Sequence, residues 1–177
     1  TPPPSRRIAD GEVLVLARRE WVTIHTPGHT GDHVCLFDPD GGTLLSGDHV
    51  LPTITPHISG LAHSPDSLAD FFAGLDKVGA LPGVSTVLPA HGGPFTDVAG
   101  RAAAIRQHHE ERLALLADIG RQVGEADVVE FSHQLFRPRS WGAMAESETF
   151  AHLEHLRLAG LARRRPHEGR LLYQIAS

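Results

Sequence analysis

This sequence of 177 residues contains one cysteine, and no apolar run in it approaches the length that spans a membrane. A single cysteine excludes an internal disulfide and a cysteine-rich zinc site. Because Cys35 lies in an apolar stretch, we expect it to be a buried side chain in a cytosolic protein. The first residues include neither an initiator methionine nor the apolar core of a signal peptide, so we expect a processed chain or a piece of a longer one.

Positive charge is scarce in the first 100 residues, although the chain has 16 lysines and arginines in total and a net charge of −5. Most of the cations follow Arg101, so any affinity for anions is expected toward the C-terminus. The apolar share of 41% is sufficient for a substantial core and for one or two domains.

The first half of the chain has the pattern of an α/β fold. Short apolar runs at residues 12–17 and 21–25 predict one hairpin, and runs at 33–37 and 43–45 predict another around the turn 38–42. A helix is expected over residues 65–80, since Leu68, Phe71 and Leu75 recur at helical spacing after a proline at the helix start. Residues 85–88 return to strand, and this alternation is typical of α/β proteins.

The second half is predicted to be mainly helical. Helices are expected near residues 102–119, 127–136 and 146–159, and two strand-like runs follow around residues 167–169. Helices followed by a hairpin resemble a winged helix, which is a helix-turn-helix variant. We expect the charged run 108–112 to be exposed on its helix.

Three short segments carry imidazole and carboxylate donors at the ends of predicted strands. They are Thr26-Pro-Gly-His-Thr-Gly-Asp-His33, Ser46-Gly-Asp-His49 and Pro89-Ala-His-Gly-Gly93. A borderline metal dication needs such donors held on stiff turns. Because loops at strand ends carry the chemistry in this class of sheet, we expect the three segments to converge on a metal site.

The three segments resemble the third, fourth and fifth motifs of the metallo-β-lactamase superfamily. The chain is most similar to the hydrolase branch that has a winged-helix-like C-terminal domain, which also occurs in a β-lactamase-like endoribonuclease. The resemblance implies that His29 binds one zinc, that Asp48 bridges two zincs as the catalytic residue, and that His91 binds the second zinc. It also implies a hydroxide between the zincs that attacks an ester, thioester, lactone or phosphodiester.

One motif of that superfamily, His-x-His-x-Asp-His, is absent from this sequence. The resemblance therefore implies the second half of an αββα sandwich over residues 1–106 and a winged-helix-like domain over residues 107–177. We expect at most one weakly bound zinc and a chain that is inactive alone. The inner face of the sheet should be an exposed apolar surface, so we expect a homodimer or association with the missing N-terminal half.

The other histidines are not expected to bind the metal ion. His25 is expected to be structural or to orient a ligand through a hydrogen bond, and His33 to be structural in preference to a supporting contact. His57 is expected to contact the substrate from the proline-containing loop 51–60, unless that loop is only a rigid connector. Surface or core positions are expected for the remaining candidates, His108, His109, His133, His152, His155 and His167.

A second function from another class is a non-catalytic nucleic-acid-binding module. Arg163–Arg165 and Arg170 lie on the expected hairpin, where cations could contact phosphates. The preceding helix carries Glu146, Glu148 and Glu154, which would repel a phosphate backbone. We therefore expect a small ester or thioester, or RNA as a substrate, in preference to sequence-specific DNA binding, and no membrane partner.

Overall fold

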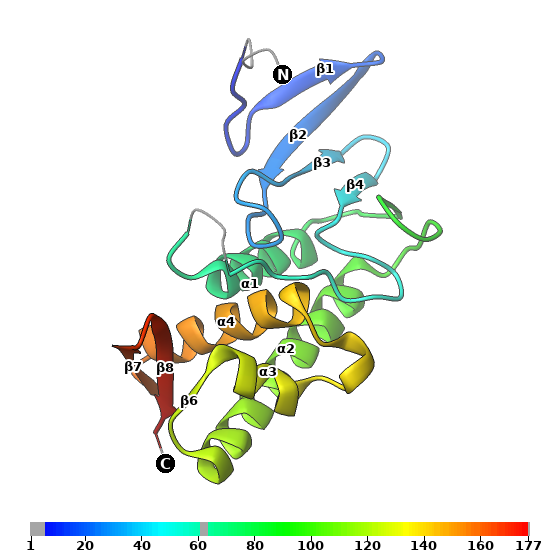
Figure 1. The fold of residues 1–177 in the computed structure, drawn as a ribbon. Coiled ribbons are helices and arrows are strands. Elements are labelled where there is room, and N and C mark those ends of the chain that lie inside the picture. The colour runs from blue at the N-terminus through cyan, green and yellow to red at the C-terminus, as the bar shows by residue number, and fades with distance from the viewer. Residues whose placement is uncertain (1–5, 61–63, 177) are drawn as a thin grey trace.

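The computed structural model describes residues 6–60 and 64–176 (Figure 1). Its first part is a five-stranded sheet whose strands follow the order of the chain. These strands are β1 (Val13–Leu16), β2 (Arg19–His25), β3 (Val34–Asp38), β4 (Thr43–Gly47) and β5 (Thr86–Pro89). Both predicted hairpins are confirmed, because β1 pairs antiparallel with β2 and β3 pairs antiparallel with β4.

Helix α1 (Ser67–Gly79) connects β4 to β5 and makes these two strands parallel, as the predicted alternation requires. The side chain of Asp66 caps this helix by accepting from the backbone N–H of Ala69. Its apolar stripe, with Leu68, Phe71 and Leu75, is buried against the sheet in the first core cluster. The helix predicted over residues 65–80 is thus confirmed.

The second part begins along helix α2 (Val98–Val123) and contains three more helical segments and a small sheet. These elements are β6 (Ala126–Asp127), α3 (Val128–Leu135), a 3-10 turn (Pro138–Ser140), α4 (Ala143–Leu158), β7 (Ala162–His167) and β8 (Arg170–Ile175). The small sheet has the order β6-β8-β7, so the predicted C-terminal hairpin is present. Over the described residues, no helix has the length and apolar composition needed to cross a membrane.

Helix α2 runs without a break through the expected domain boundary at residues 106 and 107. Ile105 belongs to the core cluster under the large sheet, whereas Leu116 belongs to a second cluster around Phe131 and Tyr173. Helices α1, α2 and α4 lie between the large sheet and the C-terminal hairpin (Figure 1). One continuous helix therefore joins two cores.

The two faces of the large sheet differ in what covers them. Phe37, Leu44 and Val87 lie opposite one another on three strands and are buried under the helices. On the other face, Leu36, Leu45 and Leu88 form a second matched row. Leu88 is 38% exposed, and the other two leucines are half-buried. An apolar row is therefore accessible on the face that the helices do not cover.

The expectation of an exposed run at residues 108–112 is wrong for His109, which is fully buried between α1, α2 and α4. The pattern of good helix-forming residues predicted the helix but not which side of α2 faces α4. Arg112 is also mostly covered, because its guanidinium pairs with Glu148 and lies 4.6 Å from the centre of the Phe136 ring.

Candidate metal centre

His29 lies in the loop that follows β2, and the loop is pressed against helix α1. A Cβ atom at Gly28 would lie 2.5 Å from Cβ of Phe71, and the φ angle of Gly28 is +130°, so only glycine fits this position. Nδ1 of His29 lies 2.7 Å from the carbonyl oxygen of His57, to which an Nδ1–H donates. This hydrogen bond leaves Nε2 of His29 with a lone pair for a metal ion.

Asp48 lies in a tight turn directly after β4. The hydroxyl of Ser46 donates to the carbonyl oxygen of Val50 at 2.8 Å and closes the turn. The backbone N–H of Asp48 donates to Nε2 of His33 at 3.1 Å. The Asp48 carboxylate is therefore free to project from a backbone that is held at two points.

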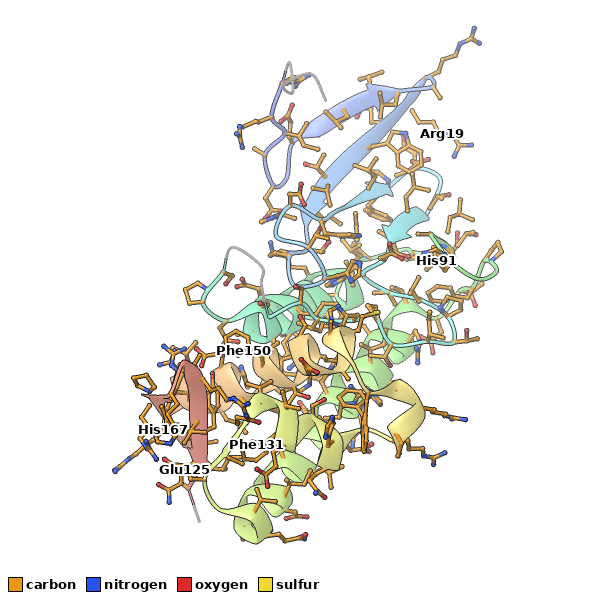
Figure 2. The ribbon with its side chains drawn as sticks, viewed as in Figure 1. Arg19, His91, Glu125, Phe131, Phe150 and His167 are labelled. Atoms are coloured by element: carbon orange, nitrogen blue, oxygen red, sulfur yellow. The ribbon has the colours of Figure 1, made fainter. Side chains whose placement is uncertain are left out.

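His91 follows β5, and its side chain meets that of Asp48. The backbone N–H of Ala90 donates to the carbonyl oxygen of Gly47 at 2.9 Å, which fixes the two strand ends side by side. Nε2 of His91 lies 3.4 Å from Oδ1 of Asp48, and the side chains are 68% and 32% exposed. The pair of His91 and Asp48 is thus accessible from solvent. Figure 2 shows His91 far from His167 and Glu125, which lie beside the C-terminal hairpin.

The ring of His33 connects this pair with His29. Burial lowers the pKa of His33, and the nearby His29 lowers it further, while Asp48 acts in the opposite direction. Two of the predicted ligands therefore lie within electrostatic range of one ring, and the third is in contact with Asp48. Asp48 and His91 thus meet at the ends of two strands, and His29 lies in the loop after a third; the donor atoms of these three residues do not all lie within 4.8 Å of one another.

His57 and His25 occupy supporting positions. His57 meets His29 through its backbone carbonyl, whereas Nε2 of its ring lies 3.1 Å from the carbonyl oxygen of Met144 at the start of α4. Burial lowers the pKa of His57. The His25 ring lies 3.0 Å from the carbonyl oxygen of Gly31, so it braces the loop that carries His29. Both residues stabilise the backbone around His29.

A second group of donors, which the sequence interpretation missed, lies between α2 and α4. In the part of the chain that the structure describes, His109, Glu148 and His152 are the group of three whose donor atoms all lie within 4.8 Å of one another. That spacing is close enough to share a metal ion. The i and i+4 positions of Glu148 and His152 on one helix are a usable signal, but nothing in the sequence pairs them with His109.

Most donors of this second group already have partners within the protein, but Nε2 of His109 is buried and makes no hydrogen bond. Nδ1 of His109 lies 3.1 Å from Nε2 of His152, whose Nδ1 lies 2.7 Å from the carbonyl oxygen of Glu148. The Glu148 carboxylate pairs with Arg112. Burial lowers the pKa of His109 to about 2 and that of His152 to about 4, so both rings are neutral near pH 7.

The basic hairpin offers few free charges for nucleic acid. Arg164, Arg165 and Arg170 form ion pairs with Glu154, Glu125 and Asp127, respectively. Glu154 also accepts from the buried hydroxyl of Tyr173 at 2.6 Å. Since acidic partners already neutralise these cations, the structure does not favour the nucleic-acid-binding alternative.

Comparison with known proteins extends these observations. The metallo-beta-lactamase superfamily profile matches residues 1–91. The crystal structure of a metallo-beta-lactamase family protein from Thermus thermophilus is similar over 98% of this chain, with a TM-score of 0.87 and 32% identity. This chain covers 55% of that structure.

Two curated relatives show shorter similarity. The lactamase-like protein vrtG of Penicillium aethiopicum is 32% identical over 108 residues, which are 61% of this chain and 33% of that protein. The acyl-coenzyme A thioesterase MBLAC2 of Gallus gallus is 40% identical over 47 residues, which are 27% of this chain and 17% of that protein. The chain thus spans a third or less of the length of these two relatives.

Proposed function

Because this chain belongs to the metallo-beta-lactamase superfamily, we propose that His29, Asp48 and His91 bind zinc in a hydrolase active site. The observation that supports this most directly is the 3.4 Å contact between Nε2 of His91 and Oδ1 of Asp48, made by residues from two different strand ends. Imidazole and carboxylate donors of this kind suit zinc. His29 fits the same role, because its hydrogen bond to the His57 carbonyl leaves Nε2 free.

When bound, zinc supplies a nucleophilic hydroxide near neutral pH and polarises the oxygen of the group under attack. The residues of this chain would bind the metal ion and fix its position. Asp48 would contact both metal positions and act as the catalytic residue, His29 would ligate the first position, and His91 the second. The partial exposure of Asp48 and His91 leaves a path for a substrate.

The substrate class that we propose is an ester, thioester, lactone or phosphodiester, and the acyl-coenzyme A thioesterase relative supports a thioester within that range. The loop 51–60 borders the site, since the carbonyl of His57 contacts His29. Its ring is already directed to Met144, so His57 would shape the substrate pocket through the loop backbone.

The single buried thiol of Cys35 agrees with a cytosolic protein.

The remaining zinc ligands would come from the part of the fold that this chain does not span. The matched Thermus structure is nearly twice as long, since this chain covers 55% of it. We propose that this additional half covers the apolar row Leu36, Leu45 and Leu88; a second copy of this chain is the alternative occupant. The order α2, β6, α3, α4, β7 and β8 agrees with a winged-helix-like domain that walls the substrate site.

Zinc titration of this chain against a competing chelating dye tests the proposal. We expect one weakly bound equivalent, because three ligands leave the second position incomplete. A chain that binds no zinc at any accessible concentration would overturn the proposed metal centre. Sedimentation velocity in the same buffer shows whether the apolar row is covered by a second copy.

A further inference from the structure

We propose that His33 is a positioning residue that holds Asp48 for the metal ion. The inference rests on the function proposed above, and it extends that function to a residue that the sequence pattern marks as merely structural. His33 lies four residues after His29 in the same loop, but its ring faces the turn that carries Asp48.

Hydrogen bonds fix the direction of the His33 ring. The backbone N–H of Asp48 donates to Nε2 at 3.1 Å, so this nitrogen carries no proton. The proton of the neutral ring is then on Nδ1, which lies 2.8 Å from Oγ1 of Thr26 and donates to it. Both ring nitrogens are used within the protein, so His33 has no lone pair for a metal ion.

The hydrogen bonds continue from Thr26 back to the Asp48 turn. Oγ1 of Thr26 lies 3.4 Å from Sγ of Cys35, and the Cys35 thiol donates to the carbonyl oxygen of Ser46 at 3.4 Å. The Thr26 hydroxyl therefore directs its own proton to the sulfur. A series of hydrogen bonds thus runs from the backbone N–H of Asp48 through His33, Thr26 and Cys35 to the backbone carbonyl of Ser46. This series fixes both sides of the turn.

Burial makes this arrangement stable. Thr26, Cys35 and Ser46 are fully buried, where a lost hydrogen bond cannot be replaced by bulk water. Burial also raises the pKa of Cys35 to about 12, so the thiol keeps its proton and remains a donor.

Gly47 shows how closely the His33 ring approaches the turn. A Cβ atom at this position would lie 2.5 Å from Nε2 of His33, and the φ angle of Gly47 is +53°. Any larger residue would push the ring away from the N–H of Asp48. The positive φ of Gly47 and the close approach of the His33 ring therefore both favour glycine in the Ser46-Gly-Asp48 segment.

Two substitutions at residue 33 separate positioning from simple space filling. Asparagine places its amide near the position of Nδ1, whereas glutamine reaches the position of Nε2 and can accept from the Asp48 N–H. We expect His33→Asn to weaken zinc binding by about 10- to 100-fold, as for other residues that support a metal ligand, and His33→Gln to retain most of the affinity. Competition with a chelating dye measures both.

Thr26 supplies an independent pair of variants. Thr26→Val is nearly isosteric but removes the hydroxyl, whereas Thr26→Ser keeps it. We expect the valine variant to bind zinc more weakly than the serine variant, although valine keeps the volume of the buried side chain and serine loses a methyl group. Thermal unfolding of all four proteins confirms that the comparison concerns folded chains.

Amide hydrogen exchange of Asp48 in the metal-free chain gives a readout that does not depend on zinc. The amide should be protected in the parent chain and in His33→Gln, and exchange much faster in His33→Asn. Equal protection in both variants, or equal zinc affinity, would overturn the role of His33. If Asp48→Asn leaves zinc binding unchanged while the exchange pattern is as expected, the proposed metal centre fails and the hydrogen bond stands.

Discussion

Two groups of histidines and carboxylates in this molecule have similar composition and opposite surroundings. His29, Asp48 and His91 lie at strand ends, and His91 is 68% exposed. His109, Glu148 and His152 lie between α2 and α4, and both histidines there are fully buried. The buried group has the closer set of donor atoms, all within 4.8 Å of one another.

The difference shows that closeness of donors is not sufficient to identify a metal site. In the helix interface most donors already bind each other or Arg112, although Nε2 of His109 is buried without a partner, so a metal ion would have to displace existing partners and add charge to a buried place. At the strand ends the backbone is held while the side chains stay available. Availability and supporting hydrogen bonds, more than distance, favour the strand-end group.

Acid should destabilise the buried helix interface, and His49, whose pKa burial lowers to about 3, should add to the same effect. Burial lowers the pKa of His152 to about 4 and that of His109 to about 2, below the unfolded value near 6.5. Above pH 6.5 both histidines are neutral in the folded and the unfolded chain, and the folded state keeps its full stability. As the pH falls below 6.5, the unfolded chain takes up protons that the buried rings do not, so the free energy of unfolding decreases. We expect a loss of up to about 1.4 kcal/mol per pH unit for each histidine, measured by urea unfolding from pH 7 to pH 5. A stability that stays constant over this range would contradict the burial of neutral rings.

Removing a strand-end ligand should have the next largest effect. We expect Asp48→Asn to weaken zinc binding by at least about 100-fold, because even residues that only support a ligand contribute about 10- to 100-fold. His167→Ala, on the exposed hairpin, is the matched control and should bind like the parent chain. Equal losses in both variants would mean that the titration reports non-specific binding.

Substitution in the helix interface should change stability and leave the metal centre intact. His152→Leu removes the acceptor for His109, and we expect a loss of about 1–3 kcal/mol in the free energy of unfolding. The number of protons taken up on unfolding between pH 7 and pH 5 should also fall by about one. Zinc affinity should be unchanged, and a large decrease would instead assign the metal to the buried group.

The smallest effect is expected at the C-terminal hairpin. Arg163 is exposed, and its neighbours Arg164 and Arg165 are already paired with acidic residues. Arg163→Ala should therefore leave both stability and zinc affinity unchanged. Electrophoretic shift of labelled RNA at low and high salt checks the alternative, which requires salt-dependent binding that weakens in this variant.

The sequence predicted the strands and α1 well, because their apolar periodicity and turn residues agree with the tertiary packing. The convergence of Asp48 and His91 also followed from their positions after neighbouring strands. The orientation of α2 was not predictable, since its apolar residues do not form a single stripe, and His109 faces inward only because α4 lies against it. The role of His33 depends on a contact with a turn 15 residues away, which spacing alone does not reveal.

Crystals of the chain soaked in zinc, with anomalous scattering recorded on both sides of the zinc absorption edge, would test the central claim most directly. The account predicts a peak beside Asp48 and His91, within reach of Nε2 of His29, and none between α2 and α4. A peak at His109, Glu148 and His152 with an empty strand-end group would contradict it.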